Sequence, residues 1–163
     1  MKRIMLAALA AAFLVAAPPA RAAEGIVIYK SLAPDVAFDL ARAALNQCRK
    51  DGYQVAVVVL DRFGIPLASL RDRFAPAAAL DIAEGKAWTA VTFTRDTSEL
   101  IKRGNIGSAL AGQPKVTLLV GGLIIQAGGS LLGGVGVAGA PGGDKDEACA
   151  KAGLAAVQDK LEF

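Results

Sequence analysis

The sequence predicts an α+β domain built on an antiparallel sheet. Apolar residues recur near the helical period of 3.6 in several segments, and two pairs of apolar, strand-like segments are each joined by a short glycine-containing turn. The predicted order along the chain is helix, hairpin, two helices, hairpin, helix. Strands joined in hairpins pair antiparallel, and the helices between the hairpins then pack on the sheet.

The first predicted elements are one helix and one hairpin. Residues 34–50 carry an apolar stripe, with Pro34 in the expected first turn and Gly52 directly after the expected end. Residues 54–61 are rich in valine, which predicts a strand that is buried on both faces. A turn at residues 62–64 leads into a second strand over residues 65–70.

Two helices are predicted in the middle of the chain. Leu80, Ala83, Ala87 and Val91 share one face of a helix over residues 77–93. Residues 94–97 interrupt this pattern. We expect Asp96 or Thr97 to cap a short helix over residues 98–103.

A glycine-rich block follows, in which residues 120–143 hold ten of the 18 glycines and residues 116–143 carry no charge. The block is long enough for a membrane span, but its paired glycines destabilise a helix. Residues 134–139 match G-x-G-x-x-G, yet Pro141 follows where a dinucleotide site needs a helix. We therefore predict a hairpin over residues 123–138 that turns at Gly128 and Gly129.

The last predicted helix begins directly after the glycines. Asp144 is expected to cap it, and Asp146 and Glu147 are expected in its first turn, near the positive end of the helix dipole. This helix contains Cys149, and the first helix contains Cys48. The two cysteines either form a disulfide between these helices or remain separate buried thiols.

The N-terminus has the features of a secretory signal peptide over residues 1–22. Lys2 and Arg3 precede an uncharged apolar run that is too short to span a membrane, and residues 20–22 form an A-x-A cleavage site. We expect a periplasmic or secreted protein with a single domain over residues 23–163. That domain has 15 basic and 15 acidic residues, so its charge gives no reason to expect a nucleic-acid partner.

The side chains available as ligands also narrow the possible chemistry. The chain has no histidine, and both methionines lie in the predicted signal peptide. A histidine-based catalytic triad, a histidine-rich zinc site and a haem ligated by His or Met are therefore excluded. Tyr29, Tyr53, Cys48 and Cys149 remain as strong ligands.

An ordered set of motifs resembles the GlcG/HbpS family, also called the haem-degrading domain family. The matching segments are GKAWTA at residues 85–90, RDT at 95–97, the glycines at 121–122, GGVGVAG at 133–139 and DEA at 146–148. The resemblance implies a profilin-like antiparallel sheet of about five strands with helices packed on it, and assembly as a homo-oligomer. Some members of the family bind haem outside the cell, and a related domain accompanies a cobalamin adenosyltransferase.

The resemblance implies an exported protein that binds haem or another small-molecule tetrapyrrole as a carrier, sensor or scavenger. The candidate binding residues are Lys86, Thr89, Thr97, Tyr53 and Arg71. Lys86 is expected either to pair with a ligand carboxylate or to be solvated. Thr89 and Thr97 are expected to contact the ligand, or else to bond to a helix carbonyl and to cap a helix. Arg71 belongs to a charged run that either binds an anion or is solvated.

Two other functions remain open at this point. The chain could be a small enzyme, or an accessory domain of an enzyme, that acts on a small organic acid or a tetrapyrrole. It could also be a structural oligomer without a ligand. The absence of histidine and of a clear pair of nucleophile and base favours binding over catalysis.

Overall fold

The computed structural model describes residues 25–104, 109–110 and 112–162. Its helices and strands are, in chain order, α1 (Pro34–Lys50), β1 (Ala56–Asp61), β2 (Pro66–Arg71), α2 (Ala79–Phe93), α3 (Thr97–Lys102), β3 (Gly122–Ala127), β4 (Ser130–Ala138), α5 (Gly143–Ala155) and the 3-10 turn η1 (Gln158–Lys160). This order confirms the predicted α+β class. The predicted signal peptide lies outside the described residues.

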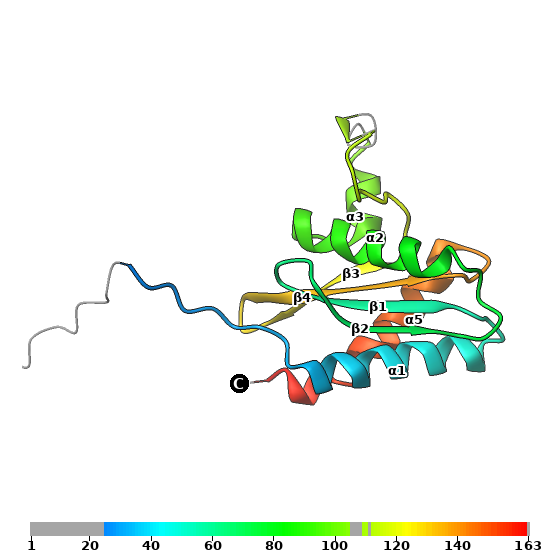
Figure 1. Ribbon diagram of the computed structural model, residues 1–163, viewed down its shortest axis with the longest axis horizontal. Helices are drawn as coiled ribbons and strands as arrows, with labels where there is room; N and C mark the ends of the chain where they lie inside the picture. The colour runs from blue at the N-terminus through cyan, green and yellow to red at the C-terminus, as the bar shows by residue number, and fades with distance from the viewer. Residues whose placement is uncertain (1–24, 105–108, 111, 163) are drawn as a thin grey trace, which may run out of the picture.

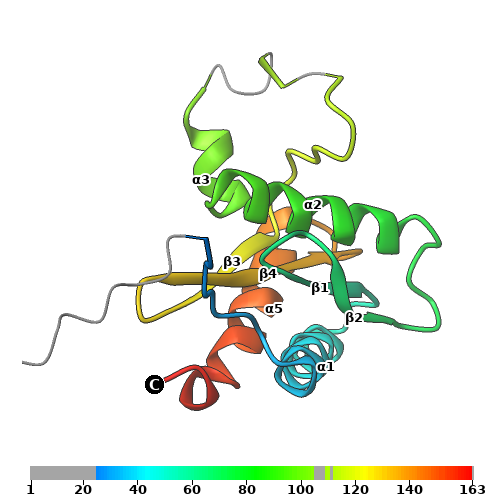
Figure 2. The same ribbon diagram turned by 60° about the vertical axis from the view of Figure 1, so that its left-hand side comes forward.

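The described strands form one antiparallel sheet in the order β2-β1-β4-β3. Helices α1 and α5 pack on one face, and α2 lies on the other face with α3 beside it (Figure 1 and Figure 2). The sheet has four strands where about five were expected. The extended segment before α1 pairs with no strand in the described part of the chain.

Both predicted hairpins are present. β1 is almost entirely buried and lies between β2 and β4. The turn between β3 and β4 uses Gly128 at φ 53° and Gly129 at φ 74°, which is the left-handed conformation that a two-residue hairpin turn needs. The glycine-rich block is therefore a hairpin. Among the described residues, no helix is long and apolar enough to cross a membrane.

Side-chain alternation along the strands divides the core into two parts. The part on the α1/α5 side is the larger one and includes Val57 and Val135 from the central strands. The part on the α2 side consists mainly of alanines, together with Val58 and Leu60 of β1. The two faces of one sheet are thus packed in different ways.

A disulfide and a close helix contact hold the α1/α5 side together. Cys48 of α1 is bonded to Cys149 of α5, with their Cα atoms 5.5 Å apart. Of the two possibilities that the sequence left open, the structure has the bridged one. The helices approach closely at Gly153, where a Cβ atom would lie 2.8 Å from the carbonyl oxygen of Leu40.

On the α2 side, glycines let the helix backbone lie directly on the sheet. A Cβ atom at Gly136 would lie 1.9 Å from the carbonyl oxygen of Ala83, and one at Gly122 would lie 2.3 Å from the carbonyl oxygen of Lys86. Any larger residue would push α2 away from β3 and β4. These glycines therefore set the height of α2 above the sheet, and with it the position of the side chains that α2 directs towards α5.

Of the predicted helix caps, that of the last helix is wrong and that of the short helix is right in position only. Helix α5 has Gly142 as its N-cap with no side-chain hydrogen bond, so the expectation that Asp144 caps it is wrong, and Asp144 lies inside the first turn. Asp96 is the N-cap residue of α3, but it makes no capping bond. Its carboxylate instead accepts the N–H of Ile124, because β3 passes close to the start of α3.

Candidate functional site

An ion pair is buried between α2 and α5. The Nζ atom of Lys86 donates to Asp146 Oδ2 at 2.7 Å and to the carbonyl oxygen of Val137 at 2.8 Å. Only 2% of Lys86 and 3% of Asp146 is exposed. The solvated alternative for Lys86 is therefore wrong: α2 lies so low on the sheet that this side chain points into the protein.

The glycine hairpin and the start of α5 hold the ion pair in place. Asp146 Oδ1 accepts the N–H of Ala140 at 3.0 Å. Gly121 lies against both charged groups, since a Cβ atom there would be 2.8 Å from Asp146 Cβ and 3.1 Å from Lys86 Nζ. Burial raises the pKa of Asp146 above its ordinary value, and the hydrogen bond and charge of Lys86 oppose that rise.

A pocket with a volume of about 440 Å³ opens over this pair. Its apolar wall is formed by Ile82, Ile101, Leu118, Leu119 and Val120. Lys86 and Asp146 form part of the floor, and the exposed carboxylate of Asp144 also lines the pocket. The pocket therefore combines an apolar wall with one compensated pair of charges and one exposed carboxylate.

Two buried threonines support the surroundings of the pocket. The hydroxyl of Thr89 donates to the carbonyl oxygen of Gly85 at 2.7 Å and accepts the N–H of Thr117 at 2.8 Å. The hydroxyl of Thr97 accepts the N–H of Gly122 at 3.0 Å. Thr89 thus holds the segment that continues into the apolar wall, and Thr97 holds the start of β3. A direct contact of either hydroxyl with a ligand stays a prediction.

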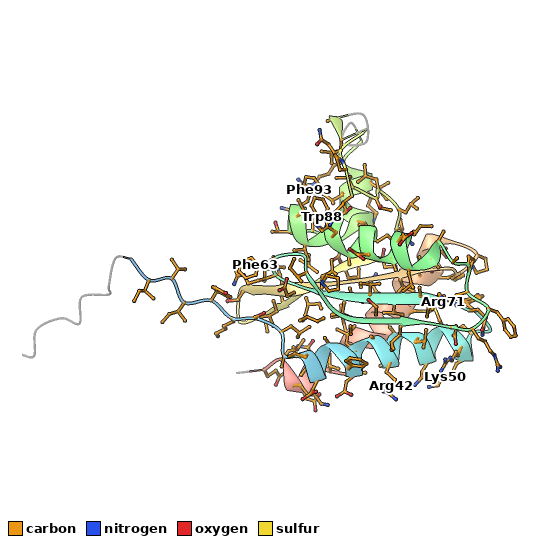
Figure 3. The ribbon with its side chains drawn as sticks, in the orientation of Figure 1. Arg42, Lys50, Phe63, Arg71, Trp88 and Phe93 are labelled. Carbon is orange, nitrogen blue, oxygen red and sulfur yellow. A yellow bond between two sulfur atoms is a disulfide. The ribbon has the colours of Figure 1, made fainter. Side chains whose placement is uncertain are left out.

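The remaining two candidate residues lie elsewhere. Tyr53 is half-buried against the core on the α1/α5 side. Arg71 lies at the end of the molecule that also carries Lys50, whereas Phe63 lies at the opposite end (Figure 3). A second pocket of about 630 Å³ is lined there by Arg49, Gln54, Arg71, Asp72 and Arg73. The structure therefore brings Lys86, Thr89 and Thr97 to one region and separates Tyr53 and Arg71 from it.

The charged run at Arg71, Asp72 and Arg73 is only partly solvated. Asp72 is buried, and its carboxylate accepts three hydrogen bonds from the guanidinium of Arg49: Nε donates to Oδ1 at 2.9 Å and to Oδ2 at 3.0 Å, and Nη2 donates to Oδ1. One of the positive charges around the second pocket is thereby compensated. The side chain of Arg71 donates to the carbonyl oxygen of Ala75.

Sequence reasoning missed two parts of the site. It assigned Asp146 to the helix dipole and did not connect it with Lys86, because nothing in the sequence relates two residues that lie 60 positions apart. It also left residues 118–120 without a role. A signal was present there: three apolar residues directly before Gly121 that lie outside the predicted strand are a candidate apolar wall.

The arrangement is suited to binding. Two of the three N–H donors of Lys86 are engaged, one by Asp146 and one by the carbonyl oxygen of Val137. Within the described ranges, no group of three or more His, Cys, Asp or Glu side chains is placed to hold a metal ion. An apolar wall beside a few charged side chains suits a largely apolar ligand with a polar edge.

Comparison with known proteins identifies one matching family. A family model described as haem degrading protein HbpS-like matches residues 32–155. A double mutant of HbpS from Streptomyces reticuli is 41% identical with a TM-score of 0.78, and the similarity covers 86% of this chain and 96% of that chain. The matched residues include the whole apolar wall and the buried ion pair.

Two further relatives share part of this sequence. The crystal structure of a PduOC:heme complex is 30% identical with a TM-score of 0.70, and the similarity covers 77% of this chain and 94% of that chain. The corrinoid adenosyltransferase PduO of Salmonella typhimurium is 33% identical over 105 residues, which are 61% of this chain and 31% of that protein. This chain therefore spans about a third of the length of the curated relatives it matches.

Proposed function

Because the chain belongs to the HbpS-like family, we propose that it is an exported protein that binds haem or a related tetrapyrrole as a homo-oligomer. Its role would be that of a carrier, sensor or scavenger. The observation that carries this proposal is the apolar pocket over the buried pair of Lys86 and Asp146. The similarity to a haem complex of PduOC supports the choice of ligand class.

The residues of the pocket fit the ring of a tetrapyrrole better than they fit its metal. Five apolar side chains can cover the ring, but no lining residue is a histidine, cysteine, methionine or tyrosine. Both cysteines of the chain are bonded to each other. The pocket would therefore hold the ligand through apolar contact, and the third donor of Lys86 is the group that could reach a carboxylate on the ring edge. A bound haem would supply an iron centre for redox chemistry or sensing.

Export is the second part of the proposal. It rests on the signal-peptide features of residues 1–22. The disulfide between Cys48 and Cys149 supports it, because structural disulfides persist in oxidising compartments and are rare in reducing ones.

The test is a titration of the chain beginning at Ala23 with hemin and, separately, with metal-free protoporphyrin. We expect a saturable change of the Soret band with each ligand. The two affinities should agree within about tenfold, because no strong iron ligand lines the pocket. The absence of any saturable change would overturn the proposal.

A matched pair of variants locates the ligand. Leu119→Glu places a charge on the apolar wall, and we expect it to weaken both ligands by at least about tenfold. Phe38→Glu changes a comparably exposed apolar residue on α1 and should bind like the unchanged chain. Equal binding by the two variants would show that the ligand lies on another surface.

Haem degradation is a second candidate function, favoured by the description of the matching family. If the protein degrades haem, the Soret band of the complex should disappear when a reductant and oxygen are added, and a ring-opened product should accumulate. A stable spectrum under those conditions would leave binding as the function.

A further inference from the structure

An apolar segment before α1 extends away from the domain. Residues 25–31 belong to no helix or strand, and Figure 1 shows this segment leaving the body of the molecule. Ile26, Val27 and Ile28 are 72%, 84% and 93% exposed. β-branched residues favour strands, and a row of exposed apolar residues is typical of an interaction surface. We call residues 25–29 the arm.

Contacts at the turn between β1 and β2 fix the direction of the arm. The guanidinium of Arg62 donates from Nη1 to the carbonyl oxygen of Lys30 at 3.2 Å and lies 5.2 Å from the centre of the Tyr29 ring. Tyr29 also meets Phe63 edge to face, with the ring centres 5.0 Å apart. The arm is therefore anchored beside the start of β2, yet it points away from its own sheet (Figure 1).

One of the two sheet edges is already blocked. β3 is an edge strand, and α3 covers the outward donors of its first half. Gly122 donates its N–H to Thr97 Oγ1 at 3.0 Å, and Ile124 donates its N–H to Asp96 Oδ1 at 2.9 Å. An incoming strand would have to break both hydrogen bonds before it could pair with β3.

The other edge, β2, is open. β2 pairs only with β1 in the described sheet. The N–H of Asp72 donates to the carbonyl oxygen of Val55, and hydrogen-bonded positions alternate along antiparallel strands, so the backbone groups of Ser69 and Arg71 point away from β1. Ile65, directly before β2, is 60% exposed and offers apolar contact to a neighbouring strand.

We propose that the arm of one copy adds as a strand to the β2 edge of a second copy, which returns the same contact through its own arm. An exchange with two-fold symmetry pairs both open edges and covers both exposed arms. The five extended residues of the arm span about 17 Å, close to the length of β2. The added strand gives each sheet five strands. This inference rests on the homo-oligomer part of the proposed function and is independent of the ligand.

The first test compares the mass in solution of the chain beginning at Ala23 with that of the same chain beginning at Tyr29, by light scattering. Ile26, Val27 and Ile28 are exposed and belong to neither part of the core, so we expect an unchanged circular dichroism spectrum and a loss of at least half the mass. If the longer chain is itself a monomer, the homo-oligomer proposal fails. If both chains have the same oligomeric mass, the oligomer stands and the role of the arm fails.

The second test locates the recipient edge by hydrogen exchange. The amides of Ser69 and Arg71 should be protected in the longer chain and should exchange at least about tenfold faster in the shorter one. Val27→Glu should reproduce the effect of the truncation, whereas Phe38→Glu, a matched change of an exposed apolar residue on α1, should not. Unchanged exchange at Ser69 and Arg71 would overturn the assignment to β2.

Discussion

The two faces of the sheet are built in opposite ways. On the α1/α5 side, alternate residues of β1 and β4 are valines that pack among leucines and alanines, and a disulfide closes this layer. On the α2 side, the corresponding positions of β4 are Gly134 and Gly136, and the helix backbone fills the space where side chains would be. Large apolar side chains dominate one face, and close backbone contact dominates the other.

The unequal packing of the two faces indicates which of them can accommodate a site. A face that buries much apolar surface gains more stabilisation than one packed through glycine and alanine. The α2 face has less apolar surface, and three of the buried polar residues, Lys86, Thr89 and Thr97, come from α2 and α3 on this side; Lys86 reaches Asp146 at the start of α5. We infer that the α1/α5 face supplies most of the stability that lets the α2 face retain buried charge and an open pocket.

Loss of the disulfide should destabilise the protein most. Replacing Cys48 and Cys149 together by alanine frees a loop of 101 residues, which should lower the free energy of unfolding by about 4–5 kcal/mol. Urea unfolding of the double variant and of the unchanged chain measures this difference. A loss below about 1 kcal/mol would show that the α1/α5 face depends on its apolar core alone.

The next largest effect concerns the buried ion pair. Lys86→Met leaves the Asp146 carboxylate buried without its cation, and breaking such a pair costs about 3–5 kcal/mol. The double variant Lys86→Met with Asp146→Leu removes both charges and should be more stable than the single variant. If the double variant is instead less stable by the sum of both single losses, the two side chains act independently.

The same variant has a pH dependence with a definite sign. Burial already raises the pKa of Asp146, and removing Lys86 removes the main influence that opposes the rise. A raised pKa in the folded state means that protonation of Asp146 favours folding. The stability gained from the protonated Asp146 is fully present below the ordinary carboxyl pKa and is lost as the pH rises through the pKa of the folded state. The free energy of unfolding that Lys86→Met loses relative to the unchanged chain should therefore be smaller at about pH 4 than at about pH 7, as urea unfolding at both values would show.

A pair of substitutions on one strand compares the faces directly. Gly136→Ala adds a methyl group that would lie 1.9 Å from the carbonyl oxygen of Ala83, and the overpacking should cost about 3 kcal/mol. Val135→Ala removes two methyl groups from the opposite face and should cost about 2 kcal/mol by leaving a cavity. Thermal unfolding of both variants tests this order. A Gly136→Ala variant as stable as the unchanged chain would mean that α2 can move off the sheet freely.

Local patterns were enough to predict the elements of both faces. The apolar stripe of α1, the valines of β1 and the glycine turn between β3 and β4 each depend on neighbours in the sequence, and all three were predicted correctly. The caps were harder. The carboxylate of Asp96 can accept a hydrogen bond from an N–H of its own helix or from the N–H of Ile124. Only the fold determines which of these donors is closer.

The site depends on contacts that the sequence does not encode locally. Lys86 is buried because Gly122 and Gly136 let α2 lie low on the sheet, and it meets Asp146 because α5 starts directly after β4. Neither the burial of Lys86 nor its contact with Asp146 can be deduced from spacing along the chain. Tyr53 and Arg71 were grouped with Lys86 by their chemistry, but Tyr53 packs against the core on the α1/α5 side and Arg71 lines a separate pocket.

An exposed ion pair on the α1/α5 side should contribute least to stability. Lys160 of η1 donates to Asp39 of α1 at 2.8 Å, and this hydrogen bond lowers the pKa of Asp39. A lowered pKa gives stability that is present above the ordinary carboxyl pKa and is lost as the pH falls through the folded pKa. Both groups are exposed, so water screens the pair, and Lys160→Ala should shift the thermal midpoint far less than Val135→Ala does. The small shift should disappear in acid. A shift as large as that of Val135→Ala would mean that surface charges, and not the apolar core, hold the end of the chain against α1.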